Sequence, residues 1–128
     1  MIVVDTSALM AIVLNERQAD DCAYVLESED RLLISAGTAA EVLIVAGRRN
    51  VRDEVNQLIN GLGFEIISVT SASARRIVEV YDRWGKGVHP AALNYGDCFA
   101  FELAKELNCR LLYAGDDFTR TDIQSALC

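Results

Sequence analysis

Four carboxylates stand at positions that ordinary structural roles explain only in part, namely Asp5, Glu41, Asp97 and Asp117. They lie far apart along the chain, so different structural elements must bring them together if they act as a group. Clustered carboxylates repel one another and raise each other's pKa unless a cation neutralises them. Oxygen-only ligands favour Mg²⁺ or Mn²⁺, and such an ion activates water and stabilises charge when a phosphodiester is cleaved. The four acids therefore predict a divalent-metal site for phosphodiester hydrolysis.

Two of these acids follow apolar runs that are typical of buried strands. Asp5 comes directly after the first such run and Asp117 soon after the last. The simpler interpretation of Asp5 is an N-cap, because a helix is expected to begin there. A Gly-Asp turn explains one of the neighbouring acids Asp116 and Asp117. The second acid of that pair needs another reason.

Glu41 lies in a predicted helix over 38–48 that is apolar on nearly every side. An unpaired buried glutamate costs free energy, so such a residue is usually paired or bound to a metal. The simpler interpretation of Glu41 is a salt bridge to an arginine such as Arg48 or Arg75. The sequence alone leaves both interpretations open.

Asp97 opens a predicted helix and has apolar residues three, four and seven places after it. That spacing puts Asp97 on the helix face that packs against the protein, not on the face toward solvent. The simpler interpretation is a carboxylate that interacts with the dipole at the amino end of its helix. The alternative interpretation is a ligand in the predicted metal site.

Short apolar runs and helical patterns alternate along the whole chain. Strands are expected at 2–4, 32–35, 65–69 and 110–113. Helices are expected from a cap at 5–7 to residue 14 and over 16–27, 38–48, 51–62, 71–84 and 95–107. Short all-apolar strands separated by helices indicate a parallel sheet covered on both faces. We therefore predict an α/β protein, a three-layer α/β/α sandwich with a central, mainly parallel sheet, whose ligands bind beyond the carboxyl ends of the strands.

The composition is that of one globular domain over residues 1–128. Apolar residues make up 52% of the 128 residues and charged residues 24%, which excludes a disordered or fibrous chain. The net charge of −7 argues against a simple basic groove for nucleic acid. It leaves open a nucleic-acid enzyme whose carboxylates hold a divalent cation.

The cysteines and the apolar runs indicate a soluble, cytoplasmic protein. Cys22, Cys98, Cys109 and Cys128 form no C-x-x-C pair and are expected to fill the core or to have no role. The run 8–14 is too short to cross a bilayer, and no signal peptide is expected at the start. We therefore predict a reducing compartment and no membrane partner.

Other chemistries fit the residues less well. A phosphatase of the haloacid dehalogenase type would need a second acid where Ser7 stands, and a response-regulator receiver would need adjacent early acids and a late lysine. His89 stands in a predicted loop with no serine nucleophile pattern around it, so a solvent-exposed residue is the simpler interpretation. Neither a G-x-G-x-x-G nor a Walker motif is present.

Several segments resemble those of PIN domains, and more narrowly those of VapC toxins, the ribonuclease halves of type II toxin–antitoxin pairs. The resemblance covers the chain from end to end. It rests on Glu41 in its apolar helix and on the segments 2–9 (IVVDTSAL), 93–98 (LNYGDC) and 111–123 (LLYAGDDFTRTDI). It implies a PIN-like fold and a Mg²⁺- or Mn²⁺-dependent endoribonuclease with RNA as its substrate.

The resemblance also implies roles for individual residues. By position, Asp5, Glu41 and Asp97 match the three core acids of the family, and Asp117 matches the fourth. Asp122 is a candidate auxiliary acid, and the hydroxyl of Thr6 or Ser7 is expected near the metal. The alternative function is a catalytically inactive PIN-like module that binds RNA or a protein, which the presence of all four acids disfavours.

Two kinds of protein partner are expected. The resemblance implies inhibition by a cognate VapB-type antitoxin, and the net charge of −7 favours a basic antitoxin segment in the acidic crevice. An antitoxin arginine is expected to take the place of the metal. The amphipathic helices after Val51 and after Ser71 predict a homodimer, or a toxin–antitoxin hetero-oligomer.

Overall fold

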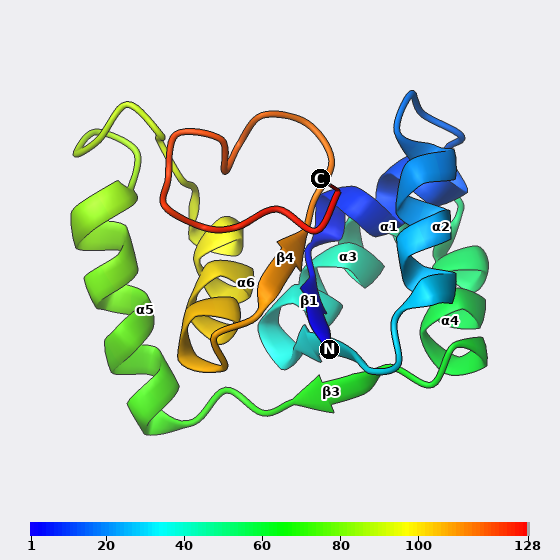
Figure 1. Cartoon of the computed structure of the whole chain (residues 1–128), viewed down its shortest axis with the longest axis horizontal. Helices are drawn as coiled ribbons and strands as arrows, with labels where there is room; N and C mark the ends of the chain where they lie inside the picture. Colours follow the sequence, from blue (N-terminus) through cyan, green and yellow to red (C-terminus); the bar gives the residue numbers. More distant parts are fainter. Residues whose placement is uncertain (128) are drawn as a thin grey trace.

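Four parallel strands form the centre of the molecule in the order β3-β2-β1-β4 (Figure 1). Their bounds are β1 (Ile2–Val4), β2 (Leu32–Ser35), β3 (Glu65–Ile67) and β4 (Arg110–Leu112). In the register of the sheet, Ile2 is paired with Leu32 on one side and with Arg110 on the other. The computed structural model describes residues 1–127, so the expectation for Cys128 lies outside the described residues.

Helices cover both faces of this sheet. Along residues 1–127 they are α1 (Thr6–Val13), α2 (Ala19–Ser28), α3 (Ala36–Arg48), α4 (Arg52–Gly61), α5 (Ser71–Trp84) and α6 (Tyr95–Glu106). In Figure 1, α5 and α6 lie on one side of β1 and β4, and α1, α2 and α4 lie on the other. The predicted three-layer α/β/α sandwich is therefore confirmed, and the strands that pair are all parallel.

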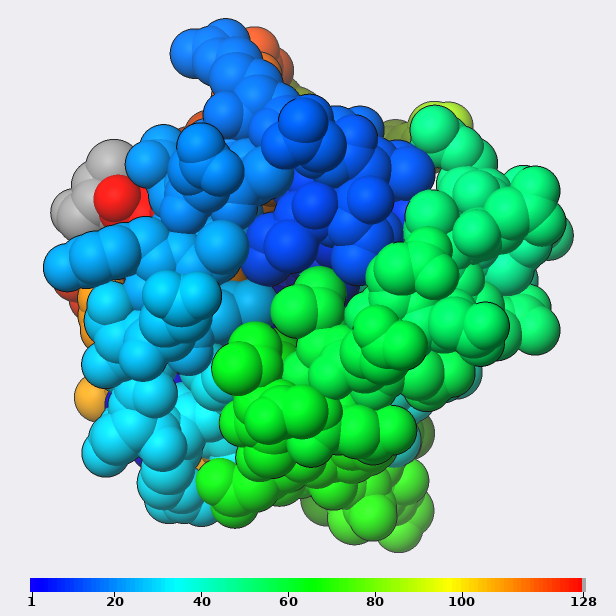
Figure 2. Space-filling model, turned by 90° about the vertical axis from the view of Figure 1, so that its right-hand side faces the viewer, coloured from blue at the N-terminus to red at the C-terminus, as the bar shows by residue number. Residues whose placement is uncertain are grey.

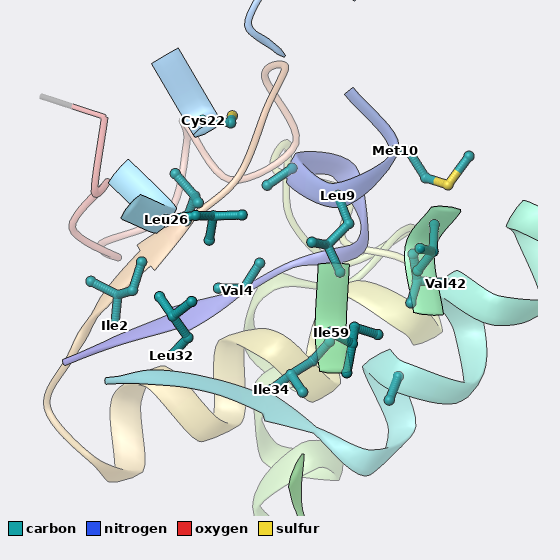
Figure 3. Packing of buried hydrophobic residues seen from close by; sticks show 14 of the residues in the cluster. Ile2, Val4, Leu9, Met10, Cys22, Leu26, Leu32, Ile34, Val42 and Ile59 are labelled. Atoms are coloured by element: carbon teal, nitrogen blue, oxygen red, sulfur yellow. The ribbon is translucent and has the colours of Figure 1, made fainter. Parts of the chain in front are cut away.

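Side chains that alternate between the two faces of the sheet form two hydrophobic cores, one on each face. Ile2 and Val4 of β1 pack with residues of α1 to α4, whereas Val3 packs with residues of α5 and α6. Successive side chains of a strand point to opposite faces of a sheet, which explains this division. Figure 3 shows the first core, in which Leu9 of α1, Val42 of α3 and Ile59 of α4 gather beside β1 and β2.

The sheet orientation brings the predicted acids to one edge. Asp5 follows β1, and Ser35, at the end of β2, is the N-cap of α3, which carries Glu41. After β4, the chain arches over the carboxyl end of the strands and returns beside β4, where the N–H of Ala126 donates to the carbonyl of Leu111 at 2.9 Å. This arch, drawn in orange to red in Figure 1, carries Asp117.

Most element bounds agree with the predicted ones to within one residue, and three differ for identifiable reasons. The helix predicted over 38–48 begins at Ala36, because Ser35 is its N-cap. The helix predicted over 16–27 begins at Ala19, because the preceding residues form a turn in which Ala19 N–H donates to the carbonyl of Glu16 at 2.9 Å. The strand predicted over 65–69 ends at Ile67. The residues after Ile67 lead into the capping box that Thr70 and Ser73 form at the start of α5.

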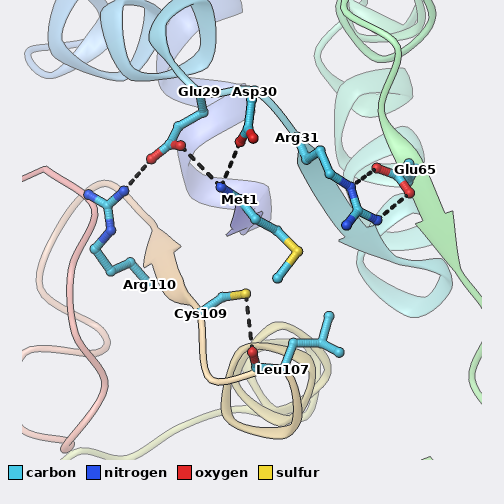
Figure 4. Close-up of polar contacts among 8 residues, drawn as sticks. All are labelled: Met1, Glu29, Asp30, Arg31, Glu65, Leu107, Cys109 and Arg110. Atoms are coloured by element: carbon cyan, nitrogen blue, oxygen red, sulfur yellow. Dashed lines mark hydrogen bonds and ion pairs between the residues drawn. The ribbon is translucent and has the colours of Figure 1, made fainter.

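At the opposite edge of the sheet, where the strands begin, the charged side chains form ion pairs. The amino group of Met1 contacts Oε2 of Glu29 at 3.2 Å and Oδ1 of Asp30 at 2.9 Å, as Figure 4 shows. Arg31 holds Glu65 with two hydrogen bonds of 2.8 Å, which tie β2 to β3. At this edge, acidic side chains are therefore neutralised by basic groups.

The predicted homodimer stays a prediction, because only one of the two helices that suggested it has an exposed apolar face. The stripe after Val51 is used by the core, because Val55 and Ile59 of α4 are buried. On α5, by contrast, Val78 and Tyr81 are exposed. Figure 2 shows the other side of the molecule, where α1 lies between α2 and the segment from α3 to α4.

The structure describes three of the four cysteines and the apolarity of the helices. Cys22 and Cys98 are buried free thiols and Cys109 is half-buried, as expected of core cysteines. No helix within residues 1–127 has the length and apolarity needed to cross a membrane.

Candidate active site

Asp5 is held in place by the first turn of α1. Its Oδ2 accepts hydrogen bonds from the backbone N–H of Ser7 at 3.0 Å and from the hydroxyl of Ser7 at 2.7 Å. The same hydroxyl accepts the N–H of Ala114 at 3.0 Å, which links the start of α1 to the segment after β4. Asp5 is therefore the predicted N-cap, but its other oxygen, Oδ1, is buried and has no hydrogen-bond partner within residues 1–127.

Glu41 reaches from α3 toward the same edge. Thr6 donates its hydroxyl to Oε1 of Glu41 at 2.7 Å, so the two hydroxyls after Asp5 each hold a different carboxylate. Glu41 is half-buried, and no ion pair within residues 1–127 includes it. The predicted alternative, a salt bridge to Arg48 or Arg75, is therefore wrong.

Asp97 is buried at the amino end of α6. Asn94 caps this helix by accepting the N–H of Asp97 at 2.8 Å, and Oδ2 of Asp97 accepts the N–H of Asn94 at 3.0 Å. This reciprocal arrangement is a capping box. Because α6 precedes the parallel strand β4, its amino end lies at the carboxyl edge of the sheet, with Asp5.

Asp117 is exposed on the segment that follows β4. Its neighbour Phe118 is 1% exposed and packs against Tyr113 with the ring centroids 5.1 Å apart. This anchor ties the exposed carboxylate to the core. Gly115, which precedes Asp116, has a φ of +83°, as the predicted Gly-Asp turn requires.

Asp5, Glu41 and Asp97 share one feature. In each carboxylate, one oxygen accepts a hydrogen bond and the other oxygen accepts none from the described residues. Among residues 1–127, no hydrogen bond is found to Oδ1 of Asp5, Oε2 of Glu41 or Oδ1 of Asp97. No ion pair in the described chain includes these acids or Asp117. In contrast to the acids in Figure 4, these carboxylates form no ion pair with a basic group within residues 1–127.

The charges of the four acids act on one another. The pKa of Asp5 is raised to about 6, mainly by burial, with smaller contributions from the charges of Glu41 and Asp117, while the hydrogen bonds from Ser7 lower it. Burial also raises the pKa of Asp97 to about 7, and the charges of Asp5, Asp117 and Glu41 contribute to the increase. Glu41 and Asp117 thus lie close enough to both Asp5 and Asp97 for their charges to raise the pKa of those two carboxyl groups.

The donor set suits a hard divalent cation. The free groups are carboxylate oxygens, which Mg²⁺ and Mn²⁺ prefer, and the buried Oδ1 of Asp5 is an acceptor without a donor. In the described part of the chain, no three His, Cys, Asp or Glu side chains are grouped tightly enough to be a ready-made set of ligands. The fit therefore rests on the chemistry and the free oxygens of the four acids.

Two hollows flank the acids. One, of about 420 Å³, is lined by Ser7, Arg17 and Gln18 and by the segment 114–116. The other, of about 440 Å³, is lined by Glu41, Arg48, Tyr95 and Phe99, among others. Arg48 thus lines the same hollow as Glu41, and Arg17 lines the hollow beside Ser7, so positive charge lies at the borders of the site.

Asp122 and His89, the two other residues considered for a functional role, each contact a neighbouring side chain. Asp122, the candidate auxiliary acid, pairs with Lys105 at 3.1 Å. His89 is half-buried and not fully exposed as predicted, because its ring packs edge-on against Trp84 with centroids 4.7 Å apart. Its Nδ1 accepts the N–H of Ala91 at 3.0 Å, which gives His89 a role in its loop.

The sequence interpretation missed two residues that shape the site. Asn94 caps the helix of Asp97, and the spacing N-x-x-D, similar to a capping box, is the signal that could have revealed it. Gly96 lies against the carboxylate of Glu41. A glycine inside a helical pattern near a carboxylate motif is the signal in that case.

Comparisons with known proteins agree with this geometry. A family model for the PIN domain matches residues 2–124. The chain is 37% identical to ribonuclease VapC42 from Mycobacterium tuberculosis over 129 residues, which cover 97% of this chain and 98% of the relative. It is 34% identical to ribonuclease VapC30 from the same organism, over 94% of this chain and 95% of the relative.

Solved structures show the same fold. VapC20 from Mycobacterium tuberculosis, a toxin that cleaves the sarcin-ricin loop, has a TM-score of 0.78 at 15% identity and 96% coverage of both chains. A chain of a toxin–antitoxin complex from Klebsiella pneumoniae has a TM-score of 0.73 at 18% identity, covering 100% of this chain and 98% of that one. VapBC2 from Rickettsia felis, bound to a DNA fragment from its promoter, has a TM-score of 0.68 at 17% identity, covering 98% and 96%.

Proposed function

This chain belongs to the PIN-domain family and, within it, to the VapC ribonucleases, and we propose that it cleaves RNA with a Mg²⁺ or Mn²⁺ ion held by Asp5, Glu41, Asp97 and Asp117. It is the toxin of a toxin–antitoxin pair, an endoribonuclease. The observation that carries the metal assignment is the set of free, unneutralised carboxylate oxygens at the edge of the sheet. An inactive binding module is not favoured, because such a module has no need for four mutually repelling acids.

The protein's own groups have definable tasks in this reaction. Thr6 and Ser7 orient two carboxylates through one oxygen each and leave the other oxygen for the cation. When bound, a divalent cation lowers the pKa of a water ligand and stabilises the charge that develops on the phosphate. Arg17 and Arg48, in the two flanking hollows, attract the phosphates of RNA toward the acidic centre. An RNA substrate also agrees with the predicted cytoplasmic location.

Cleavage of mixed RNA oligonucleotides tests this function. We expect products in the presence of Mg²⁺ or Mn²⁺ and none after chelation with EDTA. Asp117→Asn should lose more than roughly a hundredfold in rate, because a lost metal ligand should cost more than the loss of an outer-shell partner. Its neighbour Asp116, whose side chain lines only the hollow around Arg17, supplies the matched control. Equal losses in Asp117→Asn and Asp116→Asn, or cleavage that EDTA does not affect, would contradict the assignment.

We also propose that a VapB-type antitoxin covers this edge of the sheet. Two of the structurally similar chains come from toxin–antitoxin complexes, and a basic segment would complement carboxylates that form no ion pair within the described residues. An arginine suits the site, because its guanidinium binds carboxylates with two parallel hydrogen bonds. Co-expression with the adjacent small gene should give a complex that cleaves no RNA. A complex that cleaves as fast as the free chain would contradict this mode of inhibition.

A further inference from the structure

Gly96 gives the carboxylate of Glu41 the space that it occupies. A Cβ atom placed on Gly96 would lie 2.6 Å from Cδ of Glu41 and 2.8 Å from Oε1, and closer still to Oε2. Real Cβ atoms essentially never approach other atoms so closely, so one of the two groups would have to shift. The carboxylate of Glu41 therefore lies across α6 at a point where any side chain on residue 96 would exclude it.

The backbone gives no separate reason for glycine at this position. Gly96 lies in the first turn of α6 and is not among the residues with positive φ. Alanine is the better helix former at such a position. The constraint on residue 96 therefore comes from Glu41 and not from the helix.

We propose that Gly96 is a positioning residue for the divalent cation, because its missing side chain determines where the carboxylate of Glu41 lies. This inference rests on the proposed function. Oε1 of Glu41 is held by Thr6 at 2.7 Å, so a methyl group at residue 96 would have to move both the carboxylate and this hydrogen bond. The length of the side chain at residue 41 and the size of residue 96 are thus coupled. Glutamate fits beside glycine, and we expect the shorter aspartate to fit beside alanine.

Titration with Mn²⁺ alone, followed by the electron paramagnetic resonance signal of the free ion, tests this role. Gly96→Ala should weaken Mn²⁺ binding roughly tenfold or more, the range for a lost partner that orients a metal ligand. Gly47→Ala is the matched control, because its Cβ would also displace the end of a charged side chain, lying 2.9 Å from Nε of Arg52. Gly47 is at the far end of α3 from the acids, so its variant should bind Mn²⁺ as the parent does. Equal Mn²⁺ affinities of Gly96→Ala and the parent would overturn the inference.

Shortening residue 41 supplies the rescue. Glu41→Asp should weaken Mn²⁺ binding when residue 96 is glycine, because the shorter side chain no longer reaches the same place. In the Gly96→Ala background, the same Glu41→Asp substitution should instead strengthen binding. Losses that simply add in the double variant would show that residues 41 and 96 act independently and would overturn the coupling.

Melting without metal separates this inference from the proposed function. Gly96→Ala should raise the melting temperature more in a Glu41→Ala background than in the parent, because the methyl group then meets no carboxylate. A parent that binds no Mn²⁺ would overturn the proposed function and the cation role of Gly96 together, while this melting difference would still establish the contact. If the parent binds Mn²⁺ but the melting difference is absent, the function stands and the role of Gly96 is wrong.

Discussion

Asp97→Asn is expected to reduce RNA cleavage by more than roughly a hundredfold without unfolding the protein. The amide oxygen of asparagine can still accept the N–H of Asn94, so the capping box that starts α6 is preserved. The substitution removes one negative charge from a site in which Asp5, Glu41 and Asp117 repel Asp97. Loss of a metal ligand should exceed the 10–100-fold cost that is typical of losing an outer-shell partner.

Stability should change in the opposite direction to activity. Without metal, Asp97→Asn should be as stable as the parent or more stable, because repulsion among the acids is relieved. Excess Mg²⁺ should stabilise the parent by about 2.7 kcal/mol at a hundredfold excess over its dissociation constant, and the variant by much less. Asp30→Asn is the control, since Asp30 pairs with the amino group of Met1 at the opposite edge of the sheet and should leave both properties nearly unchanged. A destabilised Asp97→Asn that still cleaves RNA would show that Asp97 serves its helix alone.

The free energy of unfolding of the metal-free protein is expected to fall as the pH rises from about 4 to about 8. In the unfolded chain, an aspartate titrates near its usual pKa of about 3.9. In the folded protein, the pKa of Asp5 is raised to about 6 and that of Asp97 to about 7. Between these values the folded state keeps protons that the unfolded state has released, so stability decreases as the pH rises. Each pKa unit is worth about 1.4 kcal/mol, so shifts of about two units for Asp5 and about three units for Asp97 give an upper bound of roughly 7 kcal/mol for the loss.

Urea unfolding at several pH values, with EDTA present, measures this dependence. Asp97→Asn should flatten the slope, because one of the two raised carboxyl groups is gone. Added Mg²⁺ should recover stability at the higher pH, where the carboxylates are ionised and able to bind it. A metal-free protein whose stability rises steadily over this pH range would mean that the two acids are not destabilised by burial and mutual repulsion.

Much of the fold could be predicted from local patterns. The alternation of short apolar runs with amphipathic segments determines the parallel sheet and its two layers of helices, because each face of the sheet must be covered. Helix α5 begins and ends at the predicted residues, where Thr70 supplies a cap. Strand β3 ends earlier than predicted, because it is an edge strand and the backbone turns away to form that cap.

The four acids could be chosen from the sequence because an ordinary structural role explains each of them only in part. An unpaired glutamate in an apolar helix costs free energy, and Asp117 stands beside a second acid, Asp116, although a turn needs only one. The details of the site could not be predicted, since they depend on contacts between elements that are distant along the chain. The hydroxyl of Thr6 meets Glu41 only because α1 and α3 are adjacent in the first core. The space that Gly96 leaves for Glu41 depends on the packing of α3 against α6. The free oxygens follow from these contacts and not from the residue types.

The most direct measurement is a crystal structure of the protein soaked in Mn²⁺, with the anomalous scattering of the ion used to locate it. We expect an anomalous peak among the carboxylates of Asp5, Glu41, Asp97 and Asp117, in contact with the oxygens that the protein leaves free. The same soak of Asp97→Asn crystals should give a weaker peak or none. A peak only at other acids, such as Glu29 and Asp30 at the opposite edge, or no peak in the parent, would contradict the claim that these four residues form a divalent-cation site.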